Sequence, residues 1–308
     1  MKVLIVGLGS IAKKHVNALY CIDKKIEIFA FRTSNKNKSE SYLNVINIYN
    51  LNEINFIPNF IIISNHTILH EETIEYFLKF KKPLFIEKPF LHRLTKFSKL
   101  NLYINSNNLI TYTAFNIRFL ESINFLKNYI KNKTESINEI NVYCGSFLPD
   151  WRPNENFKNS YSANSKQGGG VHLDLIHEID YIYWIFGKPN KVISLKTSLS
   201  SLKIKSFDYA NFILQYNNFN VNIILNYYRL LPKRNIEIIS KNDIINIDLL
   251  KNNIYSAIKK KYIFKNKNRI KDTYLTQMKY FLTSLKNKKI LMNNFKESYE
   301  VLKIALND

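Results

Sequence analysis

The chain has 308 residues, of which 46% are hydrophobic and 14% aromatic, so it can bury one large core or the cores of two domains. This composition excludes a disordered tail and a disulfide-stapled miniprotein. The two cysteines, Cys21 and Cys144, lie far apart and outside any metal-ligand spacing. They predict neither a disulfide framework nor a metal site, and they favour a reducing, cytoplasmic setting.

The formal net charge of +21 suggests nucleic acid or an anionic membrane surface as possible partners. The basic residues are spread along the chain, with one denser stretch at 259–271 that we expect to face solvent, and no nucleic-acid-reading module accompanies them. We therefore expect no nucleic-acid partner. No apolar run approaches the roughly 20 residues that cross a bilayer, and the apolar start at 1–10 is too short for a signal sequence, so we expect no membrane insertion.

The first part of the chain predicts a parallel sheet with helices between its strands. Apolar runs indicate buried strands at 2–6, 26–31, 60–64, 83–87 and 109–113. Helical spacing falls between them, at 10–21, 70–80 and 94–106. Alternation at this pitch is typical of a doubly wound α/β fold, so we predict one such domain over 1–118.

The remainder, 119–308, follows a different pattern. Strands are predicted at 139–147, 191–198, 209–216, 220–228, 235–240 and 243–249, and short polar turns between them favour antiparallel neighbours. Helices are predicted at 119–131, 171–186, 274–286 and 295–305. We predict an α+β domain with an open, mainly antiparallel sheet.

A glycine-rich turn joins the first predicted strand to the first predicted helix. It reads Gly7-Leu8-Gly9-Ser10-Ile11-Ala12, a GxGxxA pattern whose small residues let the backbone approach a pyrophosphate. The free N–H groups and dipole of a helix N-terminus stabilise such an anion. We predict a Rossmann domain that binds a nicotinamide dinucleotide through Gly7, Gly9, Ser10, Ile11 and Ala12.

The residues after the second strand bear on which nicotinamide cofactor is bound. An acidic residue there would bind the ribose diol of NAD, but the sequence reads Arg32-Thr33-Ser34. These three side chains resemble a pocket for the extra phosphate of NADP. NADP is therefore favoured, and NAD stays possible because Arg32 can also stack on the adenine from the surface.

Two later strand ends add polar residues at the edge where open α/β sheets bind ligands. The loop after the strand at 60–64 supplies Ser64, Asn65, Thr67 and His70 as candidate contacts to the nicotinamide ribose, although His70 can also be an ordinary helix-start residue. The next strand ends in Glu87-Lys88-Pro89, which adds Glu87 and Lys88 as candidate cofactor contacts. A lysine held beside a cofactor can donate a proton or clamp a substrate oxygen.

Three glycines, 168–170, precede a predicted helix on which Asp174 and His177 share one face. A carboxylate beside an imidazole suits a general acid/base acting on a hydroxyl-bearing carbon. A capping carboxylate with a buried histidine is the alternative. A metal site is not expected, since His172 points away from the other two in a helix.

With these motifs in this order, the chain resembles the Gfo/Idh/MocA oxidoreductases essentially from end to end. The resemblance implies hydride transfer between a nicotinamide and a secondary alcohol or ketone of a sugar or sugar nucleotide. It implies Lys88 as catalytic lysine, with a cis bond to Pro89, Asp174 as substrate-binding acid and His177 as catalytic histidine. It further implies a homodimer or homotetramer, and late helices that return toward the cofactor domain.

Segments 147–153, 158–163 and 168–187 resemble a bacterial subgroup associated with surface-polysaccharide or nonulosonic-acid sugar clusters. Arginine forks and aromatic faces suit sugars and phosphates, which gives five candidate substrate contacts that can equally be ordinary loop packing. These are Arg118, Asp150, Trp151, Arg152 and Tyr161. The alternative function is a non-catalytic NAD(P)-binding sensor or scaffold of the same fold.

Overall fold

The computed structural model describes residues 1–32, 41–131, 136–287, 289 and 291–307. The chain forms two compact units, each with its own sheet. The first combines Met1–Phe115 with Tyr274–Tyr299, and the second combines Asn116–Thr273 with Glu300–Asp308. The division near residue 115 lies slightly before the predicted boundary at 118, and a late segment of the chain belongs to the first unit.

A six-stranded parallel sheet forms the centre of the first unit. All its strands are parallel and follow the order β3-β2-β1-β4-β5-β6. The chain adds β2 and β3 on one side of β1 and then β4, β5 and β6 on the other, so the strand order reverses between β1 and β4. The sequence predicted every strand of this sheet except β3, which is too short and too polar to stand out as an apolar run. The strands are β1 (Lys2–Val6), β2 (Glu27–Phe31), β3 (Ile46–Ile48), β4 (Phe60–Ile63), β5 (Leu84–Ile86) and β6 (Thr111–Thr113).

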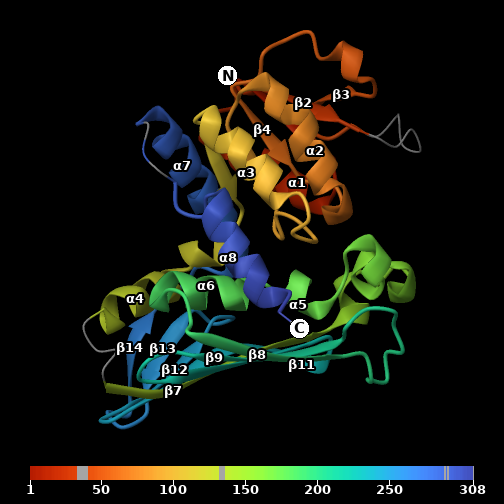
Figure 1. Ribbon diagram of the computed structural model, residues 1–308. Coiled ribbons are helices and arrows are strands. Elements are labelled where there is room, and N and C mark those ends of the chain that lie inside the picture. Colours follow the sequence, from red (N-terminus) through yellow and green to blue (C-terminus); the bar gives the residue numbers. More distant parts are fainter. Residues whose placement is uncertain (33–40, 132–135, 288, 290, 308) are drawn as a thin grey trace. The chain divides into compact units, whose positions relative to one another are not determined.

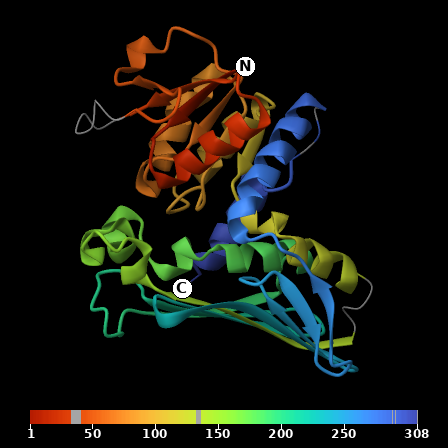
Figure 2. The ribbon, with the colours of Figure 1, turned by 180° about the vertical axis from the view of Figure 1, so that it is seen from behind.

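Helices cover both faces of this sheet. Figure 1 shows α2 and α3 on the nearer face, and Figure 2 shows α1 on the opposite one. The strands are therefore buried on both sides, which is why they read as continuous apolar runs. The helices are α1 (Ser10–Ile22), α2 (His70–Phe77), α3 (Phe97–Ser106), α7 (Thr273–Lys286) and α8 (Phe295–Ala305), which continues into the second unit.

The second unit contains an eight-stranded sheet of order β14-β13-β12-β11-β7-β10-β9-β8. Of the neighbouring strand pairs described in this sheet, β7 and β10 run parallel and all the others antiparallel. The predicted fold class, a Rossmann domain followed by an open and mainly antiparallel α+β domain, is confirmed. The strands are β7 (Ile137–Phe147), β8 (Lys191–Thr197), β9 (Tyr209–Gln215), β10 (Asn220–Asn226), β11 (Tyr228–Ser240), β12 (Ile244–Asp248), β13 (Asn253–Ser256) and β14 (Lys261–Lys265).

One face of the second sheet is covered by α4 (Glu121–Ile130), α5 (Val171–Asp174) and α6 (His177–Phe186) (Figure 1). The prediction of one continuous helix over 171–186 is wrong. Leu175, with φ −99° and ψ 28°, leaves helical geometry between α5 and α6. Within the described residues, no helix is long and apolar enough to cross a membrane.

Part of the basic stretch at 259–271 forms β14, the edge strand of the second sheet. Lys261 and Lys265 are exposed, while the Phe264 ring packs against Phe125 with centroids 4.9 Å apart. Lysines on an edge strand oppose pairing with another chain. The stretch thus combines a half-buried aromatic side chain with lysines that face solvent.

Candidate active site

The glycine turn after β1 has a conformation that only glycine adopts easily. Gly7 has a φ of 86°, and a Cβ built on it would lie 2.9 Å from both Cα and N of Asn65. The Ser64 hydroxyl lies 3.2 Å from the Val6 carbonyl oxygen and 3.1 Å from that of Gly7. The ends of β1 and β4 are therefore locked together at the point where the strand order reverses.

The second glycine of the turn is open. A Cβ on Gly9 would meet nothing within 4 Å. Gly9 is also the N-cap of α1 and has no side chain to satisfy the first N–H groups, and the first turn of α1 carries no acidic residue. An uncapped helix N-terminus with open backbone in front of it fits the pyrophosphate of a dinucleotide.

Arg32 lies directly after β2, and its backbone N–H donates to the Ile48 carbonyl at 2.8 Å. Its side chain is partly exposed at the carboxyl edge of the sheet. Thr33 and Ser34, the other two predicted contacts to an extra phosphate, lie outside the described residues. The residue directly after β2 is this arginine and not the acid that would bind the ribose diol of NAD.

His70 has a different role from the predicted cofactor contact. It is 1% exposed, and its ring nitrogens lie 3.2 Å from the Phe90 carbonyl oxygen and 3.1 Å from that of Asn65. Burial lowers the pKa of this imidazole, and a neutral ring carries one N–H, so it donates to one of these two carbonyls. The side chain ties the loop after β4 to the loop after β5. Thr67 begins the short 3₁₀ turn Thr67–Leu69, which lies in the loop after β4 and leads into α2.

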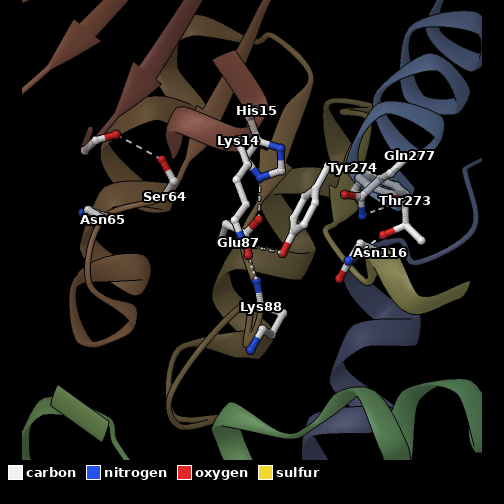
Figure 3. A network of polar contacts seen from close by, with 12 residues as sticks. Lys14, His15, Ser64, Asn65, Glu87, Lys88, Asn116, Thr273, Tyr274 and Gln277 are labelled. Carbon is white, nitrogen blue, oxygen red and sulfur yellow. Dashed lines mark hydrogen bonds and ion pairs between the residues drawn. The ribbon is translucent and has the colours of Figure 1, made fainter. Parts of the chain in front are cut away.

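Glu87, also predicted to contact the cofactor, has its carboxylate turned into the domain. Oε1 lies 2.5 Å from Nε2 of His15, and Oε2 accepts from the Lys88 backbone N–H at 3.1 Å (Figure 3). The following Lys88-Pro89 peptide bond is cis, as expected. Lys88 is partly exposed at the end of β5, among the strand ends that carry Gly7 and Asn65.

In the second unit, two tyrosines surround the carboxylate of Asp174. The Tyr227 hydroxyl donates to Oδ2 at 2.6 Å. Asp174 also raises the pKa of Tyr161, and burial with Asp174 raises that of Tyr227, so both phenols stay protonated and can donate. Sequence reasoning missed Tyr227. Since Asp174 ends α5 and His177 begins α6, the predicted shared face on one helix does not exist.

The loop carrying Tyr161 packs directly on the glycine segment before Asp174. A Cβ on Gly169 would lie 1.9 Å from the Tyr161 carbonyl oxygen, so this contact requires glycine. Arg152 stacks over the Tyr161 ring with its guanidinium carbon 5.3 Å from the centroid. The Trp151 ring meets Tyr227 edge-on at 5.4 Å. Four of the residues predicted for substrate binding or catalysis, Trp151, Arg152, Tyr161 and Asp174, thus lie together.

Other predicted residues are placed separately. Asp150 is exposed in the same short turn as Trp151. His177 is 7% exposed at the start of α6, and the His172 ring lies edge-on to Phe207. Across the described ranges, no group of three or more His, Cys, Asp or Glu side chains is arranged to hold a metal ion.

Arg118 is not placed as a substrate contact. Its side chain is fully buried, and the guanidinium binds Asp180 in a two-point ion pair, with Nε to Oδ2 at 2.9 Å and Nη2 to Oδ1 at 2.6 Å. Its guanidinium carbon also lies 5.3 Å from the Trp184 ring centroid. The Arg118 guanidinium, expected to bind substrate, instead connects two elements of the second unit: the segment that precedes α4, and α6.

Two family models match the chain. "Oxidoreductase family, NAD-binding Rossmann fold" matches residues 1–115, and "Oxidoreductase family, C-terminal alpha/beta domain" matches residues 131–306. Both belong to the GFO_IDH_MocA family, and together they span nearly all of the two units described above.

Individual proteins similar to the chain are sugar or polyol dehydrogenases. Glucose-6-phosphate 3-dehydrogenase from Bacillus subtilis is 27% identical over 190 residues, covering 60% of this chain and about half (53%) of that protein. Myo-inositol 2-dehydrogenase from Thermotoga maritima is 24% identical over 305 residues, 93% of this chain and 89% of that protein. The solved structure of UDP-N-acetylglucosamine 3-dehydrogenase GnnA from Acidithiobacillus ferrooxidans has the same fold, with a TM-score of 0.80 at 16% identity over 99% and 95% of the two chains.

Proposed function

The chain belongs to the Gfo/Idh/MocA family of oxidoreductases, and from this premise we propose that it is an NAD(P)-dependent dehydrogenase or reductase of a sugar or sugar nucleotide. The observation that carries the proposal is the open backbone at Gly9, before an uncapped helix and beside the reversal point of the sheet. A bound nicotinamide supplies a hydride donor or acceptor at its C4 carbon.

In this proposal the chain's own residues hold the substrate and move its proton. Lys88 presents an ammonium group that holds or polarises the substrate oxygen, and His177 exchanges the hydroxyl proton. Asp174 accepts from Tyr227 and binds a substrate hydroxyl with its remaining acceptor capacity. Trp151 and Arg152, which pack on the two tyrosines, are proposed to contact the sugar.

The substrate class follows from the chemistry of the Asp174 cluster. A carboxylate with phenol hydroxyls and an exposed indole suits a polyhydroxylated ring, and the partly exposed Arg152 adds a positive charge for a phosphate. The three similar proteins act, by their names, on a sugar phosphate, an inositol and a nucleotide sugar. We propose that the substrate is a sugar nucleotide in surface-polysaccharide or nonulosonic-acid biosynthesis. We also propose that the protein is cytoplasmic and forms a homodimer or homotetramer.

The test of this function is turnover with keto sugars. Purified protein with NADPH or NADH is mixed with 3-keto nucleotide sugars, 3-keto sugar phosphates and keto-inositols, and loss of nicotinamide absorbance is followed. The proposal expects turnover with at least one ketone. Tight cofactor binding without turnover across all three classes would instead favour the non-catalytic sensor.

Cofactor preference gives a first prediction on Arg32. We propose that NADP is favoured, because Arg32 supplies a guanidinium where an acid would select NAD. Arg32→Ala should weaken NADPH binding by roughly 10- to 100-fold and leave NADH within about threefold, since a hydrogen bond to a charged group contributes about 1.5–3 kcal/mol. Nicotinamide fluorescence titrations measure both constants. Equal loss for the two cofactors would contradict the phosphate role.

A second prediction concerns the open glycine. Gly9→Asp should leave the thermal midpoint within a few degrees, because the new Cβ meets no atom within 4 Å. Its carboxylate should weaken binding of either cofactor by at least roughly 100-fold, because it places like charge against the pyrophosphate. Gly9→Ala is the matched control with a smaller loss. Unchanged affinity in Gly9→Asp would show that the dinucleotide does not approach this turn.

A further inference from the structure

We propose that His15 and Glu87 form a buried positioning pair that fixes the backbone of Lys88. The inference rests on the proposed function, because it assigns this pair a role in holding the lysine of that reaction. His15 is on α1, the helix whose N-terminus is proposed to face the pyrophosphate, and Glu87 follows β5. The pair thus joins the cofactor helix to the catalytic strand end.

The contacts leave both carboxylate oxygens of Glu87 occupied by defined partners. Oε1 lies 2.5 Å from His15 Nε2, and Oε2 accepts from the backbone N–H of Lys88 at 3.1 Å. His15 is 0% exposed and Glu87 6%. Figure 3 shows the carboxylate between the imidazole and the start of the Lys88 residue, with the lysine side chain leading away from it.

The hydrogen-bonding requirements assign the proton on His15. A carboxylate can only accept, so Nε2–H donates to Glu87. Nδ1 of His15 is buried and has no hydrogen-bond partner among the residues that the structure describes. The neutral Nε2–H tautomer leaves no N–H unsatisfied there, whereas a doubly protonated ring would bury an unpaired donor.

Aromatic rings fix the orientation of the imidazole. The Phe85 ring meets it edge-on with centroids 4.8 Å apart, and the Tyr274 ring of α7 meets it at 5.9 Å and 71°. Lys14, the neighbour of His15, holds Tyr274 in turn, with its ammonium 4.8 Å from the ring centroid and 3.5 Å from the hydroxyl. A ring packed against two aromatic side chains is restricted in its orientation, so its hydrogen bond to Glu87 is preorganised.

This arrangement explains why a carboxylate precedes the catalytic lysine yet faces away from solvent. Glu87 fixes the Lys88 amide, and His15 fixes Glu87, so a shift of α1 moves the root of the lysine side chain. Misplacement of a catalytic group by about 1 Å can reduce turnover roughly 100-fold. His15 acts through another residue and is therefore a positioning residue.

The first test needs neither cofactor nor substrate. Amide hydrogen exchange is measured by NMR on the whole chain for wild type, His15→Ala, His15→Gln and Val16→Ala. Val16 is the matched control, because it is a fully buried neighbour on α1 that contacts neither carboxylate oxygen in the pair. We expect exchange at Lys88 to rise at least about tenfold in His15→Ala, to return toward wild type in His15→Gln, and to follow only the global change in Val16→Ala.

The second test is kinetic, at saturating cofactor. We expect His15→Ala to lower kcat by roughly 10- to 100-fold with cofactor Kd and substrate KM within about threefold, and His15→Gln to recover most of kcat. Unchanged Lys88 exchange in His15→Ala overturns the positioning pair, whatever the activity. An equal loss of kcat in Val16→Ala also overturns it. If exchange responds as expected but wild type shows no turnover, the proposed function fails and the link between His15 and Lys88 stands.

Discussion

Lys88→Ala is expected to lower kcat by roughly 1,000-fold while leaving the Kd of the nicotinamide cofactor within about threefold, since positioned acid–base groups contribute about 10²–10⁴ to rate. The loss is confined to chemistry because the variant keeps the backbone N–H of residue 88, which donates to Glu87. Steady-state kinetics and a fluorescence titration on the same preparation measure the two effects separately.

Two controls sharpen the Lys88 result. Lys24→Ala removes an exposed lysine just beyond the C-terminal end of α1 and should leave kcat unchanged. Lys88→Arg keeps the positive charge, but a guanidinium does not release its proton. If the ammonium works as a proton donor, Lys88→Arg stays near the alanine variant, and if it works only as a clamp, part of the rate returns. Lys88→Ala with more than a tenth of wild-type kcat would remove Lys88 from the proposed mechanism.

Arg118→Ala is expected to destabilise the fold by roughly 3–5 kcal/mol, because it removes the guanidinium that compensates the fully buried Asp180 carboxylate. Both side chains of the pair are fully buried, and the ion pair has two points of contact. The free energy of unfolding is measured by denaturant titration, followed by circular dichroism. Because Arg118 belongs to the second unit, the cofactor Kd of the surviving folded protein should change little.

The matched control for Arg118 is the more exposed ion pair between Lys96 and Glu75. Its nitrogen–oxygen distance is 3.1 Å, and its side chains are 38% and 35% exposed. Lys96→Ala should destabilise the fold far less than Arg118→Ala, because solvent screens a pair of this kind. A loss of less than about 1 kcal/mol in Arg118→Ala would show that the buried guanidinium is not structural, and would return it to the candidate substrate contacts.

The sequence was sufficient for the fold because its patterns are local. Apolar runs give the strands of the first sheet, buried on both faces, and polar turns such as Asn217-Asn218 give the antiparallel pair β9/β10. The parallel β7/β10 pair joins segments far apart in the chain, so no short-range pattern reports it. The break at Leu175 was also missed, since helical spacing continues across it.

For the candidate site, the sequence identified residue types but not the direction of each side chain. Glu87 and His70 stand at strand and helix ends that suit a cofactor, yet both are buried and bonded within the domain. In the sequence, Arg118 cannot be distinguished from an arginine that binds substrate. The structure shows that it pairs with Asp180, which is distant in the chain. Nothing in the sequence around Arg118 indicates this partner.

Tyr227 could have been predicted. Val221, Ile223 and Leu225 alternate along β10 and are all buried, and Tyr227 continues the same period of two. A tyrosine on the buried face of a strand requires a hydrogen-bond partner for its hydroxyl. That requirement, applied to the one acidic residue already singled out after the glycines, points to Asp174, which the structure confirms at 2.6 Å.

The most direct test of the central claim is transfer of deuterium. Two reduced nicotinamide cofactors are prepared, each with deuterium on one of the two faces of C4. The protein is incubated with each of them in turn and with a 3-keto nucleotide sugar. The product is analysed by mass spectrometry and NMR. The account predicts one deuterium on the new carbinol carbon, from one face of the cofactor only, and a rate of transfer roughly 1,000-fold lower with Lys88→Ala. Tight cofactor binding with no deuterium in any sugar product would contradict it.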